Sequence, residues 1–292
     1  MLLFVETVYI FVLGVFPNQI GVRKLPLGER VLFLNSEEKT RMERETGIIF
    51  LTLQGKGDLN LIDEEAIFGL GRALKEIEGD TDVRAVVLEG FGEKAFSAGV
   101  DVRIMKEFLP QNAERFIRSL HSVMSSIMKL PYPVIASIKG PCLGGGLEFA
   151  LACDIRVAAN DALFGLPEIR VGIPSVIEAS LLPRIIGWGK ARELILTGET
   201  IKAQEAYQLG LVNCVVPQEK LREECVRIAR RFVNLSPFIL GIQKDILNKW
   251  LELGHEQAIE YSIKAFATCF TTPHPREGME AFLQKKEPCY PA

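Results

Sequence analysis

Residues 140–154 read GPCLGGGLEFALACD, and they follow an apolar run at 133–138 that is typical of a buried strand. Three consecutive glycines, Gly144 to Gly146, let the backbone turn sharply and let a ligand approach the main chain closely. A helical apolar pattern begins at Leu147. The start of a helix presents unpaired N–H groups and partial positive charge. The segment therefore predicts a strand, a turn and a helix whose first turn suits a developing oxyanion.

Glu148 lies in the first turn of this expected helix and has two interpretations. It is either a catalytic acid or base, or an ordinary first-turn acid that the helix dipole favours. A second carboxylate, Glu168, follows in FGLPEIRVGIP at 164–174, where its apolar neighbours remove hydration and favour its protonated form. Two carboxylates held differently around one oxyanion site can move protons to and from the carbon next to a carbonyl.

Four segments resemble the crotonase (enoyl-CoA hydratase/isomerase) superfamily in their order and spacing. They are AFSAGVD at 95–101, GPCLGGGLEFALACDIRVA at 140–158, FGLPEIRVGIP at 164–174 and TGETIKAQEAYQLGLVNCVVP at 197–217. The resemblance runs from about residue 38 to the C-terminus. It implies an α/β protein with a crotonase-like ββα spiral core and a C-terminal all-helical region. The expected boundaries are 1–35 for an extra N-terminal segment, 36–217 for the core and 218–292 for a helical oligomerisation region.

Hydrophobic periodicity supports this division. In the expected helix that starts near Asp63, four apolar residues recur at helical spacing and predict a buried face: Ile67, Leu70, Leu74 and Ile77. A strand, helix, strand order of this kind implies parallel crossovers. Other expected strands lie at 38–53 (two, with a turn near 46–47), 83–88, 154–158, 162–164 and 211–216. Other expected helices lie at 112–129, 190–197, 202–209, 218–233, 237–253, 255–268 and 275–286.

The first sixteen residues, MLLFVETVYIFVLGVF, are apolar but too short to span a bilayer comfortably, and Glu6 interrupts them. No basic residue precedes them and no small-residue cleavage site follows, which argues against a secretory signal. Three interpretations of residues 1–35 stay open: an artefact of an upstream start site, an element docked on the core, or an element docked on a partner.

Composition excludes several other classes of protein. The 292 residues are 48% hydrophobic, enough for one large domain or a domain with a helical extension. A net charge of -3 argues against a nucleic-acid footprint. The six cysteines form no CxxC pair and are typical of reduced thiols in a cytoplasmic protein. The three histidines lie far apart without HExxH or Cys/His spacing, so we expect no metal site.

The resemblance implies roles for particular residues. The backbone N–H groups of Val100 and Gly145 would form the oxyanion hole, Glu148 would activate water, and Glu168 would deliver a proton to the α-carbon. The sequence itself does not assign which glutamate is acid and which is base. The substrate and CoA would be bound by Ala98, Asp101, Val102, Arg103, Gly144, Phe270 and Lys285.

Some of these residues have a second interpretation. Asp101 is also a plausible helix N-cap. Lys285, with Lys286, is equally explained as a solvated terminal lysine. The glycine-bearing loop at 90–101 is typical of a tight turn between strand and helix, and it does not complete a dinucleotide-binding GxGxxG.

Residues 175–180 depart from the family pattern, because SVIEAS stands where related hydratases usually have a glycine-rich run. The bulkier Val176 and Ile177 should narrow or reshape the acyl pocket. Glu178 adds a third carboxylate. It is either the end of a Ser175-x-x-Glu178 capping box that opens a helix, or a substrate-facing or accessory catalytic group.

The resemblance implies a CoA-thioester lyase, most simply a 2-enoyl-CoA hydratase in the cytoplasm. No cofactor is expected, because CoA is part of the substrate and the thioester itself makes the α-proton acidic. The expected assembly is a homotrimer or a dimer of trimers, with no nucleic acid or membrane partner. Isomerases, dehydratases and thioester hydrolases of the same superfamily remain alternatives. A non-catalytic acyl-CoA-binding protein or an RNA-binding protein is an alternative of another class, against which the two carboxylates and the acidic charge argue.

Overall fold

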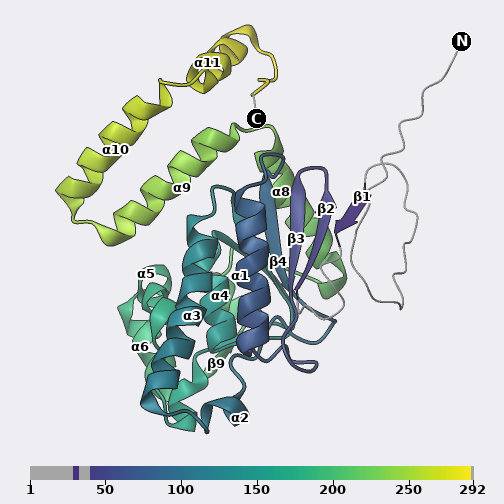
Figure 1. Ribbon diagram of the computed structural model, residues 1–292, viewed down its shortest axis with the longest axis vertical. Coiled ribbons are helices and arrows are strands. Elements are labelled where there is room, and N and C mark those ends of the chain that lie inside the picture. The colour runs from purple at the N-terminus through teal and green to yellow at the C-terminus, as the bar shows by residue number, and fades with distance from the viewer. Residues whose placement is uncertain (1–28, 33–39, 291–292) are drawn as a thin grey trace, which may run out of the picture.

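A computed structural model describes residues 29–32 and 40–290. Its main feature is a large mixed sheet in the order β1-β2-β3-β4-β5-β7-β10 (Figure 1). The first three strands pair antiparallel, and the strands from β3 to β10 pair parallel. The strands are β1 (Glu29–Leu32), β2 (Thr40–Glu45), β3 (Ile48–Leu53), β4 (Ala85–Gly90), β5 (Val134–Ile138), β7 (Ile155–Ala159) and β10 (Cys214–Val216). Apart from β1, the predicted extra segment at 1–35 lies outside the described residues.

The alternation of side chains along β3 separates two hydrophobic cores, because successive residues of a strand point to opposite faces. Ile48 and Phe50 point to the face covered by α8 (Leu221–Val233), which follows the short helix η3 (Gln218–Lys220). Ile49 and Leu51 point to the larger core. That core is covered by α1 (Glu64–Glu78), α3 (Pro110–Lys129) and α4 (Gly145–Ala152).

The predicted helices and strands of the core are confirmed within a few residues. The turn between the first two predicted strands falls at Thr46 and Gly47, both with positive φ. Helix α1 begins after Asp63, whose carboxylate accepts a hydrogen bond from the Ala66 N–H, and Ile67, Leu70, Leu74 and Ile77 are all buried. The last predicted strand is shorter than expected, because only Cys214–Val216 pairs with β7.

A second, smaller sheet lies beside the large one and carries the loops around Glu148 and Glu168. It has the order β6-β8-β9, with β6 (Pro141–Leu143), β8 (Leu163–Gly165) and β9 (Thr200–Lys202). The remaining short elements of this region are α2 (Val102–Met105), η1 (Pro167–Val171), η2 (Ile177–Leu181), α5 (Leu182–Ile186), α6 (Trp188–Thr197) and α7 (Ala203–Gln208).

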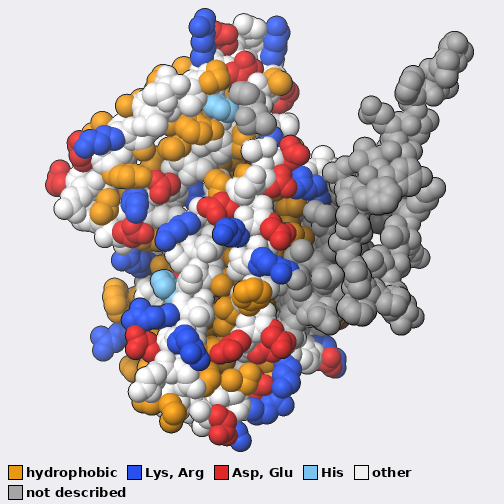
Figure 2. All heavy atoms as spheres, viewed as in Figure 1, with side chains coloured by type: hydrophobic (Ala, Val, Ile, Leu, Met, Phe, Trp, Pro, Cys, Tyr) orange, Lys and Arg blue, Asp and Glu red, His pale blue; other side chains and the backbone are white. Residues whose placement is uncertain are grey.

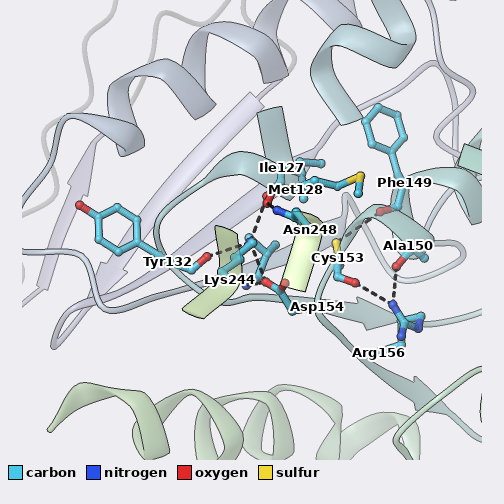
Figure 3. Close-up of polar contacts among 11 residues, drawn as sticks. Ile127, Met128, Tyr132, Phe149, Ala150, Cys153, Asp154, Arg156, Lys244 and Asn248 are labelled. Atoms are coloured by element: carbon cyan, nitrogen blue, oxygen red, sulfur yellow. Dashed lines mark hydrogen bonds and ion pairs between the residues drawn. The ribbon is translucent and has the colours of Figure 1, made fainter. Parts of the chain in front are cut away.

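A buried arginine closes the C-terminal end of α4. One nitrogen of the Arg156 guanidinium donates to the carbonyl groups of Ala150 and Cys153 (Figure 3). Another nitrogen donates to the carbonyl group of Leu211. The last carbonyl groups of a helix have no partner within the helix. Arg156 therefore satisfies these groups and fixes the helix that carries Glu148.

The C-terminal helices are α9 (Pro237–Glu252), α10 (His255–Cys269) and α11 (His274–Gln284). Helix α9 is anchored on the core by Lys244, which is 6% exposed. Its ammonium donates to the carbonyl groups of Ile127 and Tyr132 and to the Asp154 carboxylate at 2.7 Å (Figure 3). Asn248, one turn later, donates to the carbonyl group of Met128. Beyond α9, helices α10 and α11 form an arm that extends away from the core (Figure 1).

Replacing Lys244 by Met is expected to destabilise the folded chain by about 2–4 kcal/mol, because it leaves two buried carbonyl groups and Asp154 without their cation. The value is below that of a fully buried ion pair, because the Asp154 side chain is 31% exposed and also accepts from the Val134 N–H. Urea unfolding measures the change. Lys264→Met is the matched control, since its ion pair with Glu260 is exposed and is worth under about 1 kcal/mol. Equal unfolding midpoints for the two variants would contradict this account.

Candidate active site

The loop that contains Val100 is held in place by Asn60, which is fully buried. The Asn60 amide donates to the carbonyl groups of Phe91 and Ala95, and its own backbone carbonyl group accepts from the Ser97 hydroxyl at 2.7 Å. Ser97 also pairs through its backbone with residues 141–143 of β6. These bonds fix the loop beside the start of α4.

Two of the consecutive glycines are required by this packing. Gly144 has a φ of 55°, and a Cβ on it would lie 2.9 Å from Oε1 of Glu168. A Cβ on Gly146 would lie 2.3 Å from the carbonyl oxygen of Ser97, closer than any real contact. The predicted sharp turn at the glycines is confirmed, and the close approach of two backbones at Gly146 is a second reason for glycine that the sequence did not indicate.

The backbone N–H groups of Val100 and Gly145 have no hydrogen-bond partner within the described residues. Gly145 is the first residue of α4, so its N–H has no partner in the helix. Val100 packs close by, since a Cβ on Gly145 would lie 3.5 Å from Cγ2 of Val100. Both residues line one cavity. Two unpaired donors beside a helix start are suited to bind a carbonyl oxygen as it gains negative charge.

Glu148 is the more deeply buried of the two predicted carboxylates, at 4% exposed. One carboxyl oxygen accepts a hydrogen bond from the Ala179 N–H at 2.9 Å. Burial raises the pKa of Glu148 to about 8, and the negative charges of Glu168 and Glu178 act in the same direction. The sequence predicted loss of hydration at Glu168 from its apolar neighbours, whereas the structure buries Glu148 more deeply.

Glu168 is half-buried in η1 and lies across the same cavity. The backbone bond from Gly144 N–H to the Gly165 carbonyl oxygen, at 2.9 Å, joins the end of β8 to the glycine turn. The Ser175 hydroxyl donates to the Glu168 carboxylate at 2.7 Å. The structure therefore gathers both predicted carboxylates and both predicted N–H donors around one cavity.

This cavity has a volume of about 190 Å³. Seven of the predicted site residues line it: Ala98, Val100, Val102, Gly144, Gly145, Glu148 and Glu168. The rest of its wall is mostly apolar, from Met105, Ile117, Leu120, Ile173 and Val176. Sequence reasoning missed the contribution of α3. The amphipathic pattern of that helix predicted a core face, and the same face also reaches the cavity.

The raised pKa of Glu148 predicts how stability depends on pH. The folded chain holds a proton on Glu148 up to about pH 8, whereas an unfolded glutamate releases it near 4.5. This contribution to stability is complete below the unfolded pKa and is lost as pH rises through the folded pKa. Glu148→Gln is therefore expected to lose less thermal stability than wild type between about pH 5 and about pH 9. Equal losses in calorimetric scans of the two proteins would contradict it.

Four further predicted residues do not line the cavity. Asp101 is buried and caps α2 by accepting from the Arg103 N–H, so the N-cap interpretation is confirmed. The Arg103 side chain, which is 64% exposed, forms a bidentate ion pair with the same carboxylate. Phe270 and Lys285 end α10 and α11, on the arm at the opposite end of the molecule from α2 (Figure 1). One chain does not bring them to the cavity.

The capping-box interpretation of Ser175 and Glu178 is wrong. Helix η2 starts without a side-chain cap, because Ser175 bonds Glu168 and Glu178 bonds His121. Of the two bulky residues predicted to narrow the acyl pocket, Val176 lines the cavity. Ile177 instead lines a second cavity, on the other side of η2. No local pattern indicated the contacts of Ser175 and Ala179 with the two carboxylates, since their partners lie on other elements.

Three observations concern metals, membranes and thiols. Within the described residues, no group of three His, Cys, Asp or Glu side chains is placed to hold a metal ion. No helix in this described part of the chain is long and apolar enough to cross a membrane. All six cysteines are unpaired thiols.

The chain matches the family model described as enoyl-CoA hydratase/isomerase over residues 43–291. It is 35% identical to the short-chain-enoyl-CoA hydratase of Clostridium acetobutylicum over 84% of this chain and 95% of that protein. It is 33% identical to the crotonyl-CoA hydratase of Syntrophomonas wolfei over 86% of this chain and 96% of that protein.

Solved structures show the same fold. The enoyl-CoA hydratase of Bacillus anthracis superposes with a TM-score of 0.82 at 32% identity, covering 87% of this chain and 99% of that one. DspI of Pseudomonas aeruginosa superposes with a TM-score of 0.84 at 29% identity, covering 88% and 98%. The predicted fold, an α/β crotonase-like core followed by a helical region, is confirmed.

Proposed function

Because the chain belongs to the enoyl-CoA hydratase/isomerase family, we propose that it adds water across the 2,3 double bond of an acyl-CoA thioester, or removes it. The observation that carries this proposal is the single cavity that combines two unpaired backbone N–H groups with two carboxyl groups. Carbonyl polarisation and two proton transfers are the chemical requirements of this reaction.

In this proposal the thioester oxygen lies between the N–H groups of Val100 and Gly145. As water adds to the β-carbon, electrons move to the thioester oxygen and an enolate develops. Both hydrogen bonds strengthen as this charge grows, and one such donor is typically worth about 3–4 kcal/mol of the barrier. The thioester itself makes the α-proton acidic, so the mechanism uses no cofactor.

The two glutamates carry out the two proton transfers of the reaction, one with water and one with the α-carbon. One carboxylate takes a proton from water as the hydroxyl group bonds the β-carbon, and the other carboxyl group gives a proton to the α-carbon. Following the resemblance, Glu148 faces the water and Glu168 faces the α-carbon. In either direction the pair must hold one proton, which lies on Glu168 for hydration and on Glu148 for dehydration. Burial raises the pKa of Glu148 to about 8, so the pair as a whole keeps this proton up to about that pH. This predicts that kcat/KM falls as pH rises through about 8.

The shape of the cavity favours a short acyl chain. The side chains of Ile117, Leu120 and Val176 form part of a wall around only about 190 Å³. The relatives named above act on short-chain enoyl-CoA and crotonyl-CoA by their names. We therefore propose a short straight 2-enoyl thioester as the substrate. Its CoA portion would extend out of the cavity along α2, beside Val102 and Arg103.

The chain is expected to work as a homotrimer or a dimer of trimers. Large apolar side chains are exposed along α9 and the arm, where Figure 2 shows hydrophobic groups gathered: Trp250, Ile263, Phe266, Phe270, Phe282 and Leu283. Exposed apolar surface of this extent is typical of an interface. In such an assembly Phe270 and Lys285 would serve the CoA site of a neighbouring copy. Light scattering after gel filtration measures the state, and a monomer would contradict the assembly. The unpaired thiols support a reducing compartment such as the cytoplasm.

Hydration of crotonyl-CoA, followed by the loss of enoyl absorbance, tests the activity. Turnover by wild type supports the proposal. Binding of acyl-CoA without hydration of crotonyl-CoA or of branched and cyclic 2-enoyl thioesters would reject the hydratase in favour of a binding protein. Conversion of a 3-enoyl thioester alone would select the isomerase. A salt-dependent affinity for RNA, without turnover, would select the RNA-binding alternative.

A further inference from the structure

The turn at residues 175–179 contacts both proposed catalytic carboxylates. Its first residue, Ser175, donates its hydroxyl proton to Glu168 at 2.7 Å. Its last residue, Ala179, donates its backbone N–H to Glu148 at 2.9 Å. Between them Ile177 has a φ of 22°, in the region that β-branched residues rarely adopt. Such strain persists only where surrounding contacts hold the backbone in place.

A side-chain hydrogen bond to another helix holds this turn. Nδ1 of His121, on α3, lies 2.7 Å from one carboxyl oxygen of Glu178. The Glu178 side chain is 4% exposed, while that of His121 is 56% exposed. The second carboxyl oxygen of Glu178 is buried without a hydrogen-bond partner in the described part of the chain. Burial of a carboxylate with one free oxygen is costly, so a structural cap is a poor explanation for Glu178.

We propose that His121 and Glu178 form a positioning pair for Glu148, on the premise of the proposed hydratase function. The pair clamps the strained turn so that the Ala179 N–H reaches Glu148, and it keeps a fixed negative charge next to that carboxyl group. Neither side chain lines the cavity that Glu148 and Glu168 share, so both act through Glu148 and not on the substrate.

The charged groups around the pair come from five elements. Glu148 on α4 and Glu168 on η1 lie on the substrate side. The second cavity, of about 590 Å³, lies on the other side of Glu178. Its wall carries Lys129 from α3, Arg184 from α5, and Asp245, Lys249 and Glu252 from α9. Lys249 pairs with Glu252 at 2.6 Å, and the Asp245 carboxylate accepts from the Tyr261 hydroxyl. His121 is therefore the direct side-chain partner of Glu178 among the described groups.

The sign of the electrostatic effect follows from these contacts. A negative charge at Glu178 opposes ionisation of Glu148 and raises the pKa of that carboxyl group. Desolvation raises the pKa of Glu178 itself, and the His121 contact opposes this rise. Loss of Glu178 removes the charge next to Glu148, and loss of His121 lets the pKa of Glu178 rise further, which favours the uncharged form.

The test is the pH profile of kcat/KM for crotonyl-CoA hydration in Glu178→Gln, His121→Ala and the double variant. Each single variant is expected to move the alkaline limb to lower pH by about half a unit to one unit. The double variant is expected to move it no further than Glu178→Gln, because that change alone already removes the charge. Glu178→Ala, which also releases the turn, is expected to lower kcat by about tenfold or more with a smaller change in KM.

Glu252→Gln is the matched control, because it removes a carboxylate from the wall of the same cavity without contact to the turn. Its alkaline limb should coincide with that of wild type. An unmoved limb in Glu178→Gln, or additive shifts in the double variant, would overturn the proposal. A shift of equal size in Glu252→Gln would also overturn it, by showing a general effect of charge.

A second readout separates this inference from the proposed function. Infrared difference spectra of wild type minus Glu148→Gln follow the protonated Glu148 carboxyl group without any substrate. If this group titrates at lower pH in the Glu178→Gln background while no enoyl thioester is hydrated, the positioning pair stands and the hydratase proposal fails. An unchanged titration together with normal hydration would overturn the positioning pair and support the hydratase proposal.

Discussion

Replacing Glu148 by Gln is expected to lower kcat for crotonyl-CoA hydration by at least about a hundredfold, the usual contribution of a positioned acid or base. Glutamine keeps the size of the side chain, and its oxygen still accepts from the Ala179 N–H, so the fold and the turn are preserved. What is lost is the ability to exchange a proton. Because substrate binding rests on the cavity wall and the two N–H donors, KM should change much less than kcat.

Glu168→Gln is expected to cause a loss of similar size, because the reaction needs a second proton-transferring group of about equal importance. Its amide oxygen still accepts from Ser175. Glu89→Gln serves as the matched control for both variants. Burial raises the pKa of Glu89 too, but Glu89 lines a different cavity, at the carboxyl end of β4. Glu89→Gln should keep the wild-type rate. A full rate in either Glu148→Gln or Glu168→Gln would show that this glutamate is structural.

Sequence reasoning succeeded where local pattern and backbone chemistry decide the structure. The buried stripe of α1 and its start near Asp63 follow from apolar spacing, and the structure adds that Asp63 caps the helix. The turn at Gly144 to Gly146 follows from what glycine permits. Both proposed N–H donors were identified from the resemblance alone. Almost any residue type can supply a backbone N–H, so the sequence pattern does not indicate which residues do so.

The features that sequence reasoning did not predict depend on contacts between residues far apart in the chain. His121 and Glu178 are 57 positions apart, and Lys244 and Asp154 are 90 apart, so no local pattern connects them. The Ser175-x-x-Glu178 spacing fitted a capping box, but tertiary partners took both side chains. The three-residue strand β9 pairs with β8 through its backbone and is too short to show a period.

The second large effect is expected at Gly146, where Ala should lower kcat by about a hundredfold or more, the value of one oxyanion-hole donor. The added Cβ would lie 2.3 Å from the Ser97 carbonyl oxygen and 2.9 Å from the Ser97 side chain. A backbone oxygen cannot move aside as the tip of a side chain can. The loop that carries Val100 must therefore shift from the start of α4, which separates the Val100 N–H from that of Gly145.

Stability and binding distinguish this displacement from a loss of the fold. Overpacking of this kind costs about 1–3 kcal/mol, which a chain of this size tolerates. Gly146→Ala should therefore still unfold cooperatively at a lower temperature. It should also lose affinity for acyl-CoA less than it loses kcat, because the donors matter most when charge develops. Gly189→Ala is the matched control, since a Cβ there meets no atom within 4 Å and lies in helix α6. If Gly146→Ala keeps the wild-type kcat, the close approach of Ser97 to α4 does not position the oxyanion hole.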